Sequence, residues 1–426
     1  MKSQTLLDFS KSLGCALMAS PNKGKPEGGS RQYYYYHGLL RRSIQVSLRY
    51  SAIASQFTQS EAKGRTFVRS IILMSISLML FCISNNLQAQ RKTGSVYYAD
   101  DKRIQYAGRI DFTDPKLPRF WQPGVSITIR VEGESCNLVI QDEMLWGSNH
   151  NYIGLVVDGM AIRMQTRTKR DTIEIGQYLM PGKKFHDIQL IKNTEANIGY
   201  MEFVAVRCSN LLMPPTKPVR KIECIGNSIT CGTGSDMSVV LCGKGKWHDQ
   251  HNAYMSYAAI MARSLNAQSH LSSVSGIGLM HSCCNMNIIM PQVYDKISMR
   301  NDTIQWEFRN YQPDVVTICL GQNDGIQDSI AFCNNYISFL KTLRTYYPGS
   351  AFVLLSSPMA NDKLRNFMKA TITSVQQSLN SSGDKKVYSY IFKKQYSSGC
   401  DSHPSLDEHK LIAKELTTFI KKIMKW

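Results

Sequence analysis

The sequence predicts an α/β fold in which an antiparallel, jelly-roll-like β-sandwich at residues 100–215 precedes a parallel sheet with flanking helices at residues 220–426. Three observations support this prediction. Short β-rich runs separated by turn residues fill the first part, and continuous apolar runs alternate with helical patterns in the second. A Pro-rich stretch at Leu211–Val219 lies between them and is interpreted as a linker.

Four runs in the first part have the length and the β-branched content of strands. They are Val125–Val131, Cys136–Ile140, Tyr152–Val157 and His186–Ile191. Pro-Gly and Asp-Gly pairs, such as Pro123-Gly124 and Asp158-Gly159, separate them. Alternating strands broken at this spacing are typical of an antiparallel sandwich.

The second part alternates apolar strands with amphipathic helices. The expected strands are Lys221–Ile225, Asp314–Leu320 and Phe352–Ser356, and the expected helices are Ala253–Leu265, Ser329–Leu343, Asp362–Leu379 and Leu406–Lys425. This alternation predicts a parallel sheet, in which functional side chains gather at the carboxyl ends of the strands.

An apolar segment near the N-terminus, Ser70–Ile83, follows three basic residues and precedes the small residue Ala89. It is shorter than the about 20 residues that a membrane-spanning helix needs, and this order of features is typical of a signal peptide. We therefore expect a signal peptide at residues 67–90, a secreted or periplasmic protein, and no stable membrane insertion after cleavage. Residues 1–66 are interpreted as an extension from a start codon assigned too early or as a disordered extension; a cytoplasmic extension on a membrane anchor is the alternative.

The distribution of charge argues against a nucleic-acid-binding protein, and the spacing of the cysteines argues against a metal-binding one. Residues 1–90 carry +8 of the net charge of +18, and the remainder is dispersed without a basic run, unlike a nucleic-acid-binding protein. Ten of the twelve cysteines follow Gln90 without a paired C-x-x-C spacing, so we predict no metal site. Cys224 and Cys319 lie in apolar strands and are expected to be buried thiols. Disulfides suit an oxidising compartment, and their pairing stays open.

Two polar residues follow expected strands of the parallel sheet. Ser228 comes directly after the first strand, within Gly226-Asn227-Ser228-Ile229-Thr230. Asn323 follows the strand that ends at Leu320. An exposed serine on a tight turn is a candidate nucleophile, and an amide N–H at the same edge of the sheet can stabilise an oxyanion during acyl transfer. In isolation, each residue is more often simply a turn residue.

A third feature lies near the C-terminus. Asp401 and His403 immediately precede Ser405-Leu406-Asp407-Glu408, which has the spacing of a capping box at the start of the last helix. That helix fixes the loop, so His403 can accept the proton of Ser228 while Asp401 orients the imidazole.

These blocks, in this order, resemble the SGNH (GDSL-like) hydrolases. Further blocks are similar to the two-domain acetylxylan esterases of carbohydrate esterase family 2. They are Arg119–Gly124, Val156–Gly159, Lys192–Ala196, Asn252–Leu265 and Val274–Leu279, so the resemblance extends from about residue 100 to the C-terminus.

The resemblance implies a catalytic role for each matching position. Ser228 would be the nucleophile, His403 the base and Asp401 the third member of the triad, although a backbone carbonyl is the alternative partner of the histidine. The oxyanion hole would consist of the backbone N–H groups of Ser228 and Gly276 and the side chain of Asn323. Gly278 is a weaker candidate than Gly276. Asn227 stands where the family usually has Asp, and an amide can still support the turn.

Several aromatic and polar residues are candidates for contact with substrate. Trp247 and Gln322 are the predicted substrate-binding residues. His248 and His251 also suggest a metal, but no helical register aligns their rings, so lining of a substrate loop together with Trp247 is favoured. Trp121 and Trp146 are candidates for sugar stacking, with burial in the sandwich core as the favoured alternative.

The sequence and the resemblance together predict a secreted serine esterase that removes O-acetyl groups from xylan or glucomannan, without a cofactor. The expected partner is an acetylated polysaccharide or oligosaccharide, and the oligomeric state is open. The alternatives are an esterase acting on acylated peptidoglycan or lipid, and a catalytically inactive carbohydrate-binding protein.

Overall fold

The computed structural model describes residues 94–300 and 304–426, which belong to one compact unit. The predicted signal peptide at residues 67–90 and the extension at residues 1–66 lie outside the described residues. Over the described ranges, no helix combines the length and the apolar content that crossing a membrane requires.

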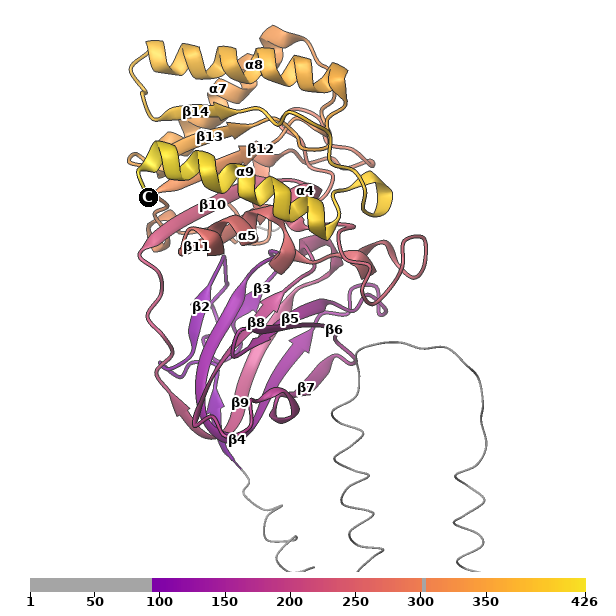
Figure 1. Ribbon diagram of the computed structural model, residues 1–426, viewed down its shortest axis with the longest axis vertical. Coiled ribbons are helices and arrows are strands. Elements are labelled where there is room, and N and C mark those ends of the chain that lie inside the picture. Colours follow the sequence, from indigo (N-terminus) through magenta and orange to yellow (C-terminus); the bar gives the residue numbers. More distant parts are fainter. Residues whose placement is uncertain (1–93, 301–303) are drawn as a thin grey trace, which may run out of the picture. The chain divides into compact units, whose positions relative to one another are not determined.

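The first part is an antiparallel β-sandwich, as the sequence predicts (Figure 1). Its strands are β1 (Ser95–Tyr98), β2 (Gln105–Ala107), β3 (Arg119–Phe120), β4 (Ser126–Asp142), β5 (Tyr152–Val157), β6 (Met160–Gln165), β7 (Arg170–Glu174), β8 (Phe185–Lys192) and β9 (Met201–Leu212), with short 3-10 turns η1 (Gly176–Tyr178) and η2 (Ala196–Ile198). The two predicted strands at Val125–Val131 and Cys136–Ile140 are the two ends of the single long strand β4.

Strand β4 joins the two layers of the sandwich. Its first half pairs with β8 and its second half with β7, while β9 pairs along most of its length. The pairing with β9 shifts register between Glu132 and Cys136, around Gly133, whose φ of +95° is a conformation that glycine adopts without strain. Ile129 and Leu138 are an odd number of positions apart and would face opposite sides of a regular strand, but with this irregularity between them both side chains lie in the buried core.

The second part is a five-stranded parallel sheet with helices on both faces, which confirms the predicted fold class (Figure 1). The strand order is β11-β10-β12-β13-β14. The strands are β10 (Arg220–Gly226), β11 (Ala267–Ser273), β12 (Val315–Cys319), β13 (Ala351–Leu355) and β14 (Val387–Tyr390). The helices are α4 (Ser228–Cys231), α5 (Tyr257–Ser264), α6 (Met290–Val293), α7 (Ser329–Tyr346), α8 (Asp362–Ser381) and α9 (Leu406–Met424), with 3-10 turns η3 (Trp247–Gln250), η4 (Ala253–Met255), η5 (Phe308–Asn310) and η6 (Cys400–Ser402).

Two hydrophobic clusters hold the helices on the sheet. Helices α7 and α8 pack on one face through residues such as Phe332 and Ile372, and α5 and α9 pack on the other through residues such as Tyr257 and Ile412. Cys224 and Cys319 are free, buried thiols in the sheet, as expected from their apolar surroundings.

A buried ion pair joins the sandwich to the parallel sheet. Arg109 of the sandwich donates to Glu223 of β10 at 2.9 Å, and both side chains are 1% exposed. Arg109 also donates to the carbonyl oxygens of Tyr294 and Lys296, and the Ser272 hydroxyl donates to Glu223. Such a pair is tolerated only when further hydrogen bonds satisfy both charges, so separating the two parts would leave two buried charges uncompensated.

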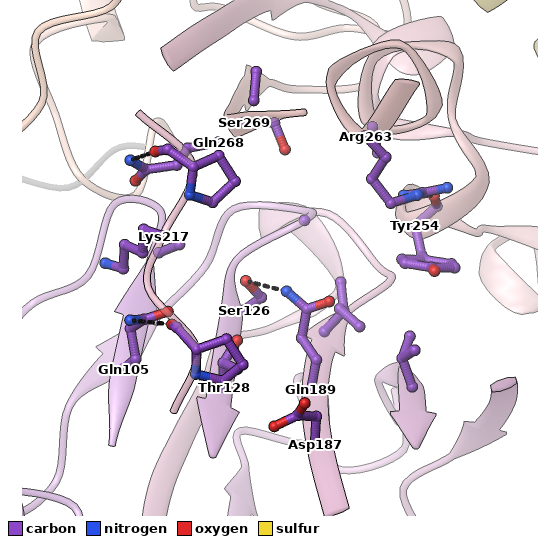
Figure 2. Close-up of a pocket in the computed structure, with 18 of the residues that line it drawn as sticks. Gln105, Ser126, Thr128, Asp187, Gln189, Lys217, Tyr254, Arg263, Gln268 and Ser269 are labelled. Atoms are coloured by element: carbon purple, nitrogen blue, oxygen red, sulfur yellow. Dashed lines mark hydrogen bonds between the residues drawn. The ribbon is translucent and has the colours of Figure 1, made fainter. Parts of the chain in front are cut away.

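A cavity of about 410 Å³ lies where the sandwich, the linker and α5 meet (Figure 2). Its amide side chains are engaged locally: Gln189 donates to the Ser126 hydroxyl at 3.1 Å, and Gln268 donates to the carbonyl oxygen of Pro218 at 2.6 Å. The cavity adjoins the start of β11, whereas the candidate nucleophile follows the end of the neighbouring β10. We therefore assign the cavity to the joint between the two parts.

Candidate active site

Strand β10 delivers Ser228 to the carboxyl edge of the parallel sheet. Gly226 ends the strand, and a Cβ there would lie 2.1 Å from the Thr230 hydroxyl, so only glycine fits the turn. The Asn227 side-chain oxygen then accepts from the backbone N–H of Ile229 at 3.2 Å and caps the short helix α4. An amide oxygen thus provides at this position the acceptor that a carboxylate would provide.

His403 lies within hydrogen-bonding distance of the candidate nucleophile. Its Nε2 is 2.9 Å from the Ser228 Oγ. Its Nδ1 faces two backbone carbonyl oxygens, those of Asp401 at 3.1 Å and Cys400 at 3.3 Å. Carbonyl oxygens only accept, so Nδ1 carries the ring proton and Nε2 is free to accept from Ser228. Burial lowers the pKa of His403 and favours the neutral imidazole.

The carboxylate of Asp401 takes no part in this hydrogen-bond pair. The residue is exposed with a φ of 52°, and within residues 94–300 and 304–426 its carboxylate makes no hydrogen bond to His403. Its negative charge raises the pKa of His403 less than burial lowers it. The geometry therefore favours the backbone carbonyls as the partners of the imidazole.

The loop that carries His403 is fixed at both ends. A capping box between Ser405 and Glu408 begins α9 directly after the histidine, as the sequence predicts. On the other side, a disulfide joins Cys400 to Cys242, 158 residues away in the sequence, and the backbone N–H of Cys400 donates to the Gly234 carbonyl oxygen. The base is thus tied both to the last helix and to the segment that follows the nucleophile.

The candidate oxyanion residues lie on the loops that follow the two strands paired with β10, at the same edge of the sheet as Ser228. Asn323 follows β12 and donates through its Nδ2 to the Ile277 carbonyl oxygen at 2.8 Å, which leaves its second N–H for another acceptor. Gly276 precedes Ile277 and has a φ of +82°. The Asp324 carboxylate accepts from the backbone N–H groups of Leu279 and two following residues, which anchors the loop.

Two family descriptions match most of the chain that the structure describes, including Ser228 and Asn323 but not His403. "Carbohydrate esterase 2 N-terminal" matches residues 106–215, and "GDSL-like Lipase/Acylhydrolase family" matches residues 224–391. The structure of a family two carbohydrate esterase from Clostridium thermocellum, in complex with cellohexaose, has a TM-score of 0.70 and 31% sequence identity, and the match covers 76% of this chain and 99% of that one. This chain belongs to carbohydrate esterase family 2. It is therefore an ester hydrolase, and both the predicted family and the predicted enzyme class are confirmed.

Curated relatives agree with this assignment. An acetylxylan esterase/glucomannan deacetylase from Cellvibrio japonicus is 27% identical over 365 residues, which cover 84% of this chain and 98% of the relative. The cellulase/esterase CelE from Acetivibrio thermocellus is 32% identical over 345 residues, which cover 77% of this chain. The esterase chain spans only 40% of the length of CelE.

The sandwich of this esterase also contributes a contact to the active site that residue-by-residue analysis did not predict. Glu195, which precedes η2, is fully buried and accepts from the backbone N–H of Ser275 at 2.5 Å and from the Cys231 thiol at 3.6 Å. It thus links the loop before Gly276 to the helix that begins at Ser228. Its block, Lys192–Ala196, was recognisable only as part of the family resemblance.

Lys192 supports the loop that presents Glu195. Its Nζ is buried and donates to the carbonyl oxygens of Thr194 at 2.7 Å and Glu195 at 3.0 Å. Burial lowers the pKa of Lys192 to about 7 and raises the pKa of Glu195. A sandwich loop thereby approaches the catalytic centre through buried polar groups.

The other candidate residues occupy different places around the site. Trp247 is 46% exposed, and its ring lies 4.4 Å from that of the buried His251, centroid to centroid. His248 is also buried, and no group of three or more metal-ligating side chains occurs within residues 94–300 and 304–426. Gln322 accepts from the Ser357 hydroxyl at 2.5 Å.

The two tryptophans considered for sugar stacking differ in exposure. Trp121 is buried and packs at 5.6 Å against Tyr200, in a cluster that also contains Trp306. Trp146 is 83% exposed. Trp121 is thus buried against residues of the α/β part and not in the sandwich core, and the expectation that Trp146 is buried is wrong.

Proposed function

We propose that this esterase hydrolyses O-acetyl groups on a polysaccharide through an acetyl-enzyme intermediate on Ser228. The observation that carries the proposal is the 2.9 Å contact between Ser228 Oγ and His403 Nε2, with Nδ1 held by carbonyl oxygens. A nucleophile and a base at hydrogen-bonding distance, with the base oriented by a third group, are the arrangement that covalent acyl transfer needs.

In the first half of the reaction, Ser228 Oγ attacks the acetyl carbonyl carbon while its proton passes to His403 Nε2. The oxyanion that forms accepts hydrogen bonds from the backbone N–H groups of Ser228 and Gly276 and from the free N–H of Asn323. The ester C–O bond then breaks, and the departing sugar oxygen takes the proton from His403.

In the second half, water attacks the acetyl group on Ser228 and gives its proton to His403. Collapse of this intermediate releases acetate, and His403 returns the proton to Ser228. The lowered pKa of His403 supports this cycle because the neutral ring is available as a base at the start of each half.

The substrate class is proposed from two comparisons. A relative from Cellvibrio japonicus is named an acetylxylan esterase/glucomannan deacetylase, and the related Clostridium thermocellum structure holds cellohexaose. Both point to β-linked plant polysaccharides, so we propose acetylated xylan or glucomannan. Trp247 and Gln322 are the proposed substrate-contacting residues on the α/β side.

Export is part of the same proposal. A disulfide such as Cys242–Cys400 belongs to proteins of oxidising compartments. With the predicted signal peptide at residues 67–90, it supports a secreted or periplasmic protein whose mature chain begins at Arg91. N-terminal sequencing of the exported protein tests this, and a mature protein that retains residues before Ser70 contradicts it.

Trapping the intermediate tests the proposed reaction. The enzyme is mixed with nitrophenyl acetate, quenched with acid and digested, and the peptide that contains Ser228 is analysed by mass spectrometry. We expect one added acetyl group on Ser228, and faster cleavage of the acetate than of long-chain nitrophenyl esters. Faster cleavage of long acyl chains, or acetylation elsewhere, would contradict the proposal.

A further inference from the structure

The exposure of one tryptophan of the sandwich, Trp146, is not explained by packing in the folded protein. Trp146 lies in the loop between β4 and β5, is 83% exposed and has a φ of 62°. An indole ring normally stabilises a protein by burial, and a bulky residue in the left-handed region is strained by about 1–3 kcal/mol. Both features disfavour tryptophan at this position, which points to a role outside folding.

The base of this loop is well fixed. The buried carboxylate of Asp142 accepts from the backbone N–H groups of Met144 at 3.1 Å and Asn151 at 2.9 Å, and from the Asn151 amide at 2.7 Å. These bonds join the start of the loop to its end. The exposed indole of Trp146 is therefore presented by an anchored loop.

The loop of Trp146 is bonded to the segment of Trp247. Lys246 Nζ donates to the carbonyl oxygen of Ser148 at 2.5 Å and to the side-chain oxygen of Asn149 at 2.9 Å. Lys246 directly precedes Trp247. These contacts bring two exposed tryptophans, one from the sandwich and one from the α/β part, to the same edge of the molecule.

The turn that carries Trp247 is bonded to the segment after the nucleophile. Trp247 begins the 3-10 turn η3, and Gln250 at the end of this turn accepts through its carbonyl oxygen from the backbone N–H of Asp236 at 2.9 Å. Asp236 lies in the segment that the Cys242–Cys400 disulfide joins to the loop of His403. Hydrogen bonds and a disulfide thus connect the turn of Trp247 to the loop that carries the base.

We propose that Trp146 and Trp247 form an aromatic surface that stacks sugar rings of the polysaccharide main chain beside the ester being hydrolysed. One face of a pyranose ring carries C–H groups, which lose water on contact with an indole face. The inference rests on the proposed function and extends it. The sandwich becomes part of the substrate-binding site, and Trp146 a determinant of preference for polymeric over small esters.

Comparison of a small and a polymeric substrate tests the proposal. The full chain is assayed as wild type, Trp146→Ala and Trp146→Phe, with nitrophenyl acetate and with acetylated glucomannan. We expect Trp146→Ala to raise KM for glucomannan about tenfold, the scale on which truncated interface tryptophans act. The ratio of kcat/KM for glucomannan to that for nitrophenyl acetate falls by the same factor. Trp146→Phe, which keeps an aromatic ring, restores most of this ratio.

Phe185→Ala is the matched control. Phe185 is a 40% exposed aromatic residue of the sandwich, and it begins β8, whereas Lys192 near the active site ends that strand. We expect the substrate ratio of this variant to equal that of the wild type. A ratio for Trp146→Ala within twofold of wild type would refute the proposal, as would equal losses on both substrates.

Retention of unacetylated glucomannan separates this surface from the proposed reaction. In native gels that contain the polysaccharide, the wild type should be retarded and Trp146→Ala should be retarded less, even if glucomannan acetate is not released. Equal retardation of the two proteins contradicts the surface. The proposal is also contradicted if sedimentation shows that Trp146→Ala converts a dimer to a monomer while its retardation in the glucomannan gel equals that of the wild type.

Discussion

The Asp401→Asn variant distinguishes two ways of orienting the catalytic base. The imidazole Nδ1 of His403 faces the carbonyl oxygens of Asp401 and Cys400 at 3.1 and 3.3 Å, and both oxygens remain when the carboxylate becomes an amide. Asparagine also tolerates the φ of 52° at this position, so the backbone is preserved. The substitution therefore removes only the charge.

The expected loss follows from the exposure of that charge. Two unit charges a few ångströms apart in water interact by about 1 kcal/mol, so kcat/KM should fall by about fivefold or less. Removing an aspartate that fixes the histidine tautomer instead lowers kcat by about four orders of magnitude in serine proteases. The assay is kcat/KM on nitrophenyl acetate, with Asp407→Asn, another exposed carboxylate of the same region, as control. A loss of a thousandfold or more in Asp401→Asn alone would refute the carbonyl account.

Three further outcomes follow from the site. Asn323→Ala should lower kcat by about 10²–10³-fold, because one oxyanion donor is lost; retained thermal stability with kcat within threefold would contradict its role. The acidic limb of kcat/KM should have its midpoint below pH 6.5, because burial lowers the pKa of His403 and activity falls only as the ring becomes protonated; a midpoint above pH 6.5 would contradict the burial argument. Glu195→Gln keeps an acceptor for the Ser275 N–H but removes its charge, so kcat should fall about tenfold with a smaller change in KM. Glu202→Gln, in the sandwich ion pair with Arg119, is its control and should leave kcat unchanged.

The fold class and the long helices were predictable because they carry periodic apolar patterns. Several strands were not predicted, among them β9, β11 and β14. For β11 the reason is that its sequence from Ala267 to Ser273 is rich in polar residues that are buried by pairing, as Ser272 is with Glu223. Helix α5 begins at Tyr257, later than the apolar pattern from Ala253, because Ser256 caps it after a separate 3-10 turn. Local polar contacts of this kind leave little trace in hydrophobic periodicity.

In the candidate site, too, some contacts could be predicted from the sequence and others could not. Ser228 and His403 could be paired from motif order, because each adjoins a regular element. The contacts of Glu195 with Ser275 and of Cys242 with Cys400 could not, because they join segments 80 and 158 residues apart. Such contacts depend on how the sandwich and the loops pack.

The most direct test of the central claim is acetate release from acetylated xylan and glucomannan by the wild type and by Ser228→Ala. Ser381→Ala, an exposed serine at the end of α8, is the matched control. We predict that the wild type and the control release acetate equally, and that Ser228→Ala is slower by two or more orders of magnitude. Acetate release by Ser228→Ala at the wild-type rate, or no release by a folded wild type, would contradict the account.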